Sequence, residues 1–367
     1  MVEMKKRNLL QAVRRELGIV WAIARKDVVY ALQNKTILSL VVGVCMMVLM
    51  SKALPLILAL SGKKTVVLYD AGRSRSIAGL KTRQDMRLIR VRSFEDMHEV
   101  LTTADEAQLG VVLPADLDQQ IASGQPLVLS GYAAHWVGQK EVDRLSGLFG
   151  EALGELTGQD VTVVMAEERL YMRPEWGSMV CGVIVLVIVL TGSLLLPYLL
   201  MDERQSKTLD ALRVSPATIR QVVVGKALAG SVYCFAAAGI VFAINYAMVV
   251  QWGLAVLAAF CCALFAIGVG LLMGSLFESA QAMSAVGGLL LALLVGPVYL
   301  PEQVIEGVPL IGDLVSWFPP VVLEKMICFS FSNLTPGSDL WVRLGGVLGM
   351  VLVLYLAVGF RMARLDR

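Results

Sequence analysis

The chain has 367 residues, of which 57% are hydrophobic and only 17% charged, and its formal net charge is +2. Soluble globular domains carry about 25% charged residues, so this composition excludes a water-soluble globule and indicates an integral membrane protein. The six cysteines lie in or beside apolar segments. Their spacing predicts neither a disulfide framework nor a metal site.

Residues 1–35 contain an excess of Lys and Arg over Asp and Glu. Because positively charged flanks stay on the cytoplasmic side, we expect the N-terminus in the cytoplasm. Apolar residues recur at helical spacing between positions 9 and 24, with basic residues between them, which predicts an amphipathic helix lying in the inner membrane interface. Packing of this helix on another subunit is an equal alternative.

Residues 36–61 form the first predicted transmembrane helix, and residues 62–173 then hold nearly half of the charged residues of the chain. Short β-rich runs alternate there with helical patterns, which predicts an α/β domain with a largely parallel or mixed sheet. Since one span separates this domain from the N-terminus, we expect it outside the cytoplasm. The expected strands are 65–69, 87–91, 110–113, 126–129 and 161–165, and the expected helices are 93–103, 115–122 and 140–156.

Residues 174–367 are predicted to form a five-helix transmembrane region. The pairs Gly270/Gly274 and Gly345/Gly349 each give a helix a small-residue face that favours close helix packing. Prolines interrupt residues 301–338, so we expect broken helices in the outer leaflet there. The expected spans are 176–201, 221–250, 254–277, 283–300 and 340–360.

The fold class that follows is an α-helical integral membrane protein with six transmembrane helices and an extracytoplasmic α/β domain inserted between the first and second spans. This count places both termini, and the charged loop 202–220, in the cytoplasm. Within the loop we expect a short surface helix from Glu203 to about Val214, ended by Pro216. Such a helix is either a plain connector or a docking surface for another protein.

No catalytic, cofactor-binding or metal-binding residues are predicted in this chain. The only histidines, His98 and His135, have no Cys or Glu partner at metal-ligand spacing, and no G-x-S-x-G sequence occurs. The Gly-Lys pairs at 62–63 and 225–226 lack the first glycine of a phosphate loop. ATP that drives transport would therefore bind to another polypeptide. The scarcity of charged residues within the spans also disfavours an ion-coupled carrier.

The loop sequence resembles the signature of ABC-transporter permeases of the type-2 export class. The resemblance rests on Glu203, on the run from Thr208 through Leu209 and Asp210 to Ser215-Pro216, and on Gly225-Lys226. Lys26-Asp27 in the N-terminal helix is also similar to the family. The family has Gly where Lys207 stands and Glu where Asp210 stands. Its arrangement of one span, a large outer domain and five further spans matches nearly the whole chain.

The resemblance implies that the loop is a coupling helix seated on a separate cytoplasmic ABC ATPase subunit, which binds ATP and Mg. Two permeases, as a homodimer or a heterodimer, would enclose the pathway within membrane lipid, and no nucleic-acid partner is expected. Glu203 and Arg204 would make the polar contacts, and Leu209 and Leu212 the packing contacts. The other implied coupling residues are Thr208, Asp210 and Pro216.

The expected function is the permease subunit of an exporter in the cell membrane, as a multi-pass protein of the bacterial plasma membrane. Its substrate would be drug-like, lipidic or otherwise amphipathic, because the spans hold few fixed charges. The alternative is a membrane-anchored receptor or scaffold whose outer domain binds a ligand or partner without transport.

Overall fold

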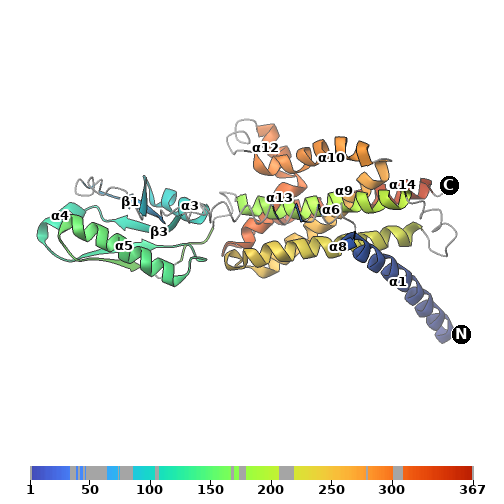
Figure 1. The fold of residues 1–367 in the computed structure, drawn as a ribbon, viewed down its shortest axis with the longest axis horizontal. Coiled ribbons are helices and arrows are strands. Elements are labelled where there is room, and N and C mark those ends of the chain that lie inside the picture. Colours follow the sequence, from blue (N-terminus) through green and yellow to red (C-terminus); the bar gives the residue numbers. More distant parts are fainter. Residues whose placement is uncertain are drawn as a thin grey trace.

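The computed structural model describes residues 2–33, 39, 42–43, 46, 64–72, 74, 86–103, 107–166, 169–172, 179–205, 219–277, 280–300 and 309–365. An α/β domain lies at one end of an elongated molecule and a bundle of long helices at the other (Figure 1). The helix α1 (Val2–Gln33) projects from the side of the bundle away from the α/β domain.

The α/β domain is built on a five-stranded mixed sheet in the order β2-β1-β3-β4-β5. All neighbouring strands pair in parallel except β3 and β4, which are antiparallel. The strand and helix ranges expected from the sequence are confirmed to within a few residues at their ends. The elements are β1 (Lys64–Asp70), β2 (Met86–Val91), α3 (Phe94–Thr103), β3 (Ala107–Leu113), α4 (Leu117–Ser123), β4 (Leu127–Tyr132), α5 (Gln139–Thr157) and β5 (Val161–Met165).

Both faces of this sheet are covered, because alternate side chains of a strand point to opposite faces. Val66 and Leu68 of β1 pack in one apolar cluster with Phe149 of α5, whereas Val67 between them packs with Met97 of α3. All five of these side chains have no exposed surface. The near-continuous apolar character of β1 is therefore the expected signature of a strand buried on both faces.

The protein is mostly helical outside this domain, and four of the described helices are long and apolar enough to cross a membrane. They belong to α6 (Met179–Gln205), α8 (Ile219–Ile244), α9 (Trp252–Leu276) and α14 (Ser338–Leu365). In the most apolar stretch of each helix, 78% of the residues of α6 but only 22% of those of α14 are buried. Thus α6 lies at the centre of the bundle and α14 at its periphery.

The count of six spans stays a prediction. The expected first span, residues 36–61, lies almost entirely outside the described residues. The expected fifth span falls on α10 (Ala280–Val295) and the 3-10 helix η4 (Gly296–Tyr299). With 16 residues, α10 alone is shorter than the ~20 residues that cross the hydrocarbon core of a bilayer.

The expected third span, 221–250, extends too far at its C-terminal end. The helix α8 stops at Ile244 and a 3-10 turn, η3 (Tyr246–Met248), follows. At this end the Asn245 side chain donates a hydrogen bond of 2.8 Å to the carbonyl oxygen of Val241, which also accepts a hydrogen bond from the Asn245 backbone N–H. Asn is common at such ends because its amide can bond locally to the backbone.

The segment expected to contain broken helices is indeed interrupted within its described part. The short helix α12 (Pro309–Ser316) is followed by α13 (Pro319–Ser330), whose first two positions are prolines. Proline suits the first turn of a helix, where its missing N–H has no role. The apolar side chains of α13, including Leu323 and Ile327, are buried in the core of the bundle. The placement of this segment in the outer leaflet stays a prediction.

Gly270 and Gly274 lie where α9 crosses α6. A Cβ on Gly270 would overlap the carbonyl oxygen of Gly192, and one on Gly274 would lie 2.6 Å from Cδ1 of Leu200. Since real Cβ atoms do not approach other atoms this closely, only glycine permits the observed helix separation at these two positions.

Gly345 and Gly349 make no such contact within the described part of the chain. A Cβ on either of them would meet nothing within 4 Å among the described residues, so the close packing expected at this pair stays a prediction. The packed glycine of α14 is Gly346, where a Cβ would lie 3.0 Å from the ring of Trp317. The reason is helical phase: residues 345 and 349 lie on the exposed side of a peripheral helix.

Candidate coupling site

Three helices meet near the residues that flank the charged loop. α6 ends at Gln205 and α8 begins at Ile219, and α1 packs against α8. Val28 of α1 also packs against the cluster that contains Leu199 of α6. The backbone of α6 continues as a helix to Gln205, so Glu203 and Arg204 belong to its last turn. The expectation that a separate surface helix begins at Glu203 is therefore wrong. The sequence did not indicate this continuation, because the apolar span ends at Met201, four residues before the helix ends at Gln205.

Lys226, in the second turn of α8, is the central residue of this site. Its side chain is completely buried, and its Nζ lies 3.2 Å from Oδ2 of Asp27 on α1, whose side chain is only 3% exposed. The same Nζ donates a hydrogen bond of 3.2 Å to the carbonyl oxygen of Leu199 on α6. One ammonium group thus joins all three helices.

The neighbouring residues bring α1 close enough for this contact. A Cβ on Gly225 would lie 2.7 Å from Cγ2 of Ile23, so the absence of a side chain at Gly225 allows α1 to approach α8. Further along α8 from Lys226, the Tyr233 hydroxyl donates a hydrogen bond of 2.6 Å to the carbonyl oxygen of Val28 on α1. The ion pair, the glycine and the tyrosine together fix the position of α1 along α8.

The burial of the Asp27–Lys226 pair determines how much the pair contributes to the stability of the fold. Taking two charges out of water costs several kcal/mol per ion, and their attraction offsets this cost only when both remain in place. Removing one partner leaves an uncompensated buried charge, which costs about 3–5 kcal/mol. The pair is therefore weak as a source of net stability and strong as a constraint on how the three helices are arranged.

Of the residues that the resemblance assigned to the ATPase contact, the structure positions only two. Glu203 and Arg204 lie on α6 by their backbone, and their side chains are outside the described residues. The remaining coupling residues also lie outside the described part of the chain: Thr208, Leu209, Asp210, Leu212 and Pro216.

Sequence reasoning missed the pairing of Asp27 with Lys226, although both residues were noted. A signal was present, because each is a charged residue in a helix whose neighbours on the same face are apolar, and buried charges occur almost only in pairs. Their separation of 199 positions hid the contact.

The two histidines bond to backbone carbonyl oxygens. Nε2 of His98 lies 2.8 Å from the carbonyl oxygen of Tyr171, and Nε2 of His135 lies 3.2 Å from that of Met248. The second contact joins the α/β domain to the turn between α8 and α9. In the described part of the chain, one group of three potential metal ligands has its ligand atoms within 4.8 Å of one another: Cys181, Glu324 and Cys328.

Residues 147–323 match the family model described as ABC-2 type transporter. The match begins in α5, includes α6, α8, α9 and α10, and ends in α13, so it contains the loop and both helices that flank it. No curated protein matches the chain.

Proposed function

Because the chain carries an ABC-2 type transporter membrane domain, we propose that it is the permease subunit of an ATP-driven exporter. A separate cytoplasmic ATPase binds ATP and Mg and docks on loop 202–220. Two permease subunits, identical or similar, enclose the transport pathway. The observation that carries this proposal is the three-helix junction at Lys226, which lies at the base of the loop.

The junction gives the loop a mechanical role. A force applied to residues 206–218 reaches the end of α6 and the start of α8 directly through the chain. Lys226 joins α8 to the Leu199 carbonyl of α6 and to Asp27 of α1, so the three helix ends move together. Rigid-body movement of packed helices is a known way to convert a local push into a change of the whole domain.

The central helices suit a pathway for an amphipathic substrate. The buried residues of α9 are almost all small or apolar, including Ala258, Cys262 and Gly268. Among the described side chains of α6, the buried polar ones are Thr191 and Ser193. Both hydroxyls bond to backbone carbonyls, those of Val187 and Ala266 respectively. We therefore infer a drug-like or lipidic substrate in preference to an inorganic ion or a sugar.

The variant Asp27→Asn tests this function at the junction. It preserves the shape of the side chain but removes the negative charge opposite Lys226, so the helices should still insert while the connection between α1 and α8 weakens. In proteoliposomes with the partner ATPase, we expect lower substrate-stimulated ATP hydrolysis with normal co-purification.

Arg25→Gln, an exposed position two residues away on α1, is the matched control and should behave as the wild type. Stimulated hydrolysis that is unchanged in Asp27→Asn would contradict the proposed role of the junction. Failure of every ABC ATPase tested to bind the wild-type chain would favour the receptor or scaffold alternative.

A further inference from the structure

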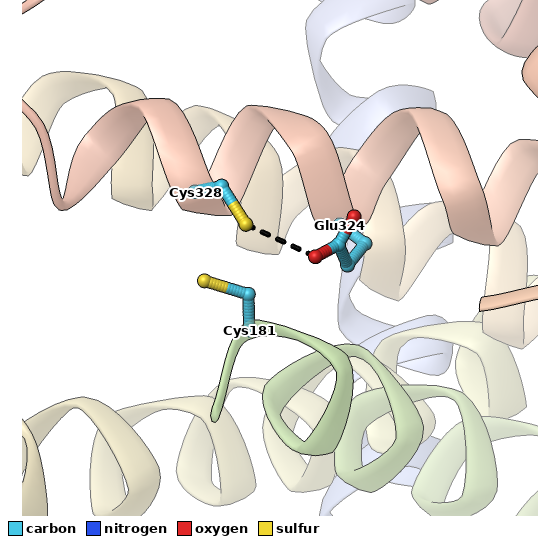
Figure 2. A group of neighbouring side chains, drawn as sticks. All are labelled: Cys181, Glu324 and Cys328. Atoms are coloured by element: carbon cyan, nitrogen blue, oxygen red, sulfur yellow. Dashed lines mark hydrogen bonds between the residues drawn. The ribbon is translucent and has the colours of Figure 1, made fainter. Parts of the chain in front are cut away.

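Two helices of the bundle bring two thiols and a carboxylate together in its interior. Glu324 and Cys328 lie one turn apart on the same face of α13, and the side chain of Cys181, near the start of α6, lies opposite them (Figure 2). The two sulfurs and one carboxylate oxygen lie within 4.8 Å of one another. Both cysteines have no exposed surface, and Glu324 is only 8% exposed.

We propose that Cys181, Glu324 and Cys328 bind a zinc ion that ties α13 to α6. Zinc is bound by Cys sulfur at about 2.3 Å and by carboxylate oxygen at about 2.0–2.2 Å in tetrahedral geometry. Two sulfurs on one such ion are about 3.8 Å apart, which follows from these bond lengths. The atoms lie within 4.8 Å of one another already, so changes in side-chain rotamer complete the site without moving either helix.

The donor set selects zinc among the common metal ions. Magnesium and calcium prefer oxygen ligands throughout, and copper(I) is satisfied by thiolates alone. Two thiolates with one carboxylate match a borderline ion that accepts both sulfur and oxygen, with water as the fourth ligand. The Cys328 thiol donates a hydrogen bond of 3.0 Å to Oε1 of Glu324, so these two ligand groups already lie side by side.

Binding exchanges protons for the ion. Each cysteine loses its thiol proton to water as its Zn–S bond forms, and the carboxylate of Glu324 gives up the hydrogen bond from Cys328 to become the third ligand. The two thiolates balance the charge of zinc, and the carboxylate as the third anionic ligand leaves one negative charge on the loaded site. Because two protons leave, zinc affinity rises with pH.

The site lies where a bound metal ion would stabilise the packing of α13 against α6. Cys181 is near the end of α6 that follows the α/β domain, and α13 is one of the short helices of the interrupted segment. A short helix of 12 residues has little intrinsic stability, since helices below ~12–15 residues are marginal by themselves. A zinc ion shared with α6 fixes α13 against the long central helix.

The test uses the purified full-length chain in detergent under reducing conditions, with zinc content measured after dialysis and with cobalt(II) as a spectroscopic substitute for zinc. The variants are Cys181→Ser, Cys328→Ser and Glu324→Gln. Cys261→Ser, which alters another buried cysteine of the bundle, is the matched control. Thermal unfolding with and without zinc reports whether each variant is folded.

We expect about one zinc per chain in the wild type and the control, and a cobalt spectrum with thiolate charge-transfer and tetrahedral bands. Each Cys→Ser variant should lose these bands, and Glu324→Gln should weaken binding at least about tenfold. Zinc should raise the unfolding temperature of the wild type and of the Cys261→Ser control, and should leave that of the Cys181→Ser and Cys328→Ser variants unchanged. Equal binding by the wild type and the Cys→Ser variants would overturn the proposal. X-ray absorption of the wild type that shows no sulfur around zinc would also overturn it, even if the variants fail to fold.

Discussion

The Nζ atom of Lys226 lies 3.2 Å from Oδ2 of Asp27, although 199 positions separate the two residues in the sequence. Both side chains are buried. The contact connects the N-terminal helix to the first turns of α8, directly beyond the charged loop. It therefore makes α1 part of the unit that would respond to a partner on that loop.

The first prediction is that Lys226→Met destabilises the protein by about 3–5 kcal/mol, because it leaves the Asp27 carboxylate buried without its cation. The double variant Asp27→Leu/Lys226→Met removes both charges and should regain most of this loss. Unfolding measurements on the two single variants and the double variant give the coupling energy. Additive effects in this cycle would show that the two side chains do not interact.

Gly225→Ala should separate α1 from α8, because the added Cβ would lie 2.7 Å from Cγ2 of Ile23. Overpacking of this kind costs about 1–3 kcal/mol. The expected result is a lower unfolding temperature and faster proteolysis within α1. Gly239→Ala is the matched control in the same helix, because a Cβ there meets nothing within 4 Å. If both variants resist proteolysis equally, α1 does not depend on the close approach at Gly225.

Acidification should loosen the contact between the α/β domain and the bundle at His135. Burial lowers the pKa of His135 below its usual 6.5, against the opposing effect of its bonds to the Met248 and Leu170 backbone, and the nearby charge of Arg169 lowers the pKa further. Between the folded and unfolded pKa values the unfolded chain binds more protons. The stability contribution is therefore complete above pH 6.5 and is lost as the pH falls below it.

The measurement for this prediction is the unfolding temperature as a function of pH in the wild type and in His135→Gln. Glutamine can still donate to the Met248 carbonyl but does not titrate. The difference between the two curves should be constant above pH 6.5 and change as the pH falls below it. Parallel curves across the whole range would show that protonation of His135 does not affect this contact.

The α/β domain was the part of the fold most readily predicted from the sequence. Its strands and helices are short, and turn residues such as Gly124 and Gly158, which adopt positive φ angles of 75° and 71°, separate them clearly. The period of the apolar pattern changes at each boundary, so local information was sufficient. The buried centre of β1, from Thr65 to Leu68, also stands out in the sequence by its run of apolar residues.

Contacts between distant segments were not predictable in the same way. The Asp27–Lys226 pair, the Cys181–Glu324–Cys328 group and the bond from His135 to Met248 each join residues that are far apart in the chain. No periodicity reports such contacts, because they depend on how the helices pack. The exposed positions of Gly345 and Gly349 show the same limit: spacing identified a small-residue face, but only packing determines what it meets.

The central claim is that loop 202–220 transmits the movement of a separate ATPase to this membrane domain, and the activity of the reconstituted complex tests it most directly. The variants Glu203→Ala and Leu209→Asp change the loop, and Glu151→Ala, an exposed position in the α/β domain, is the control. Each is co-purified with the ATPase, and substrate-stimulated ATP hydrolysis and transport are measured.

We expect both loop variants to insert normally, to bind the ATPase weakly and to lose stimulated hydrolysis and transport, while Glu151→Ala matches the wild type. Normal co-purification, hydrolysis and transport in both loop variants would contradict the coupling role of this loop.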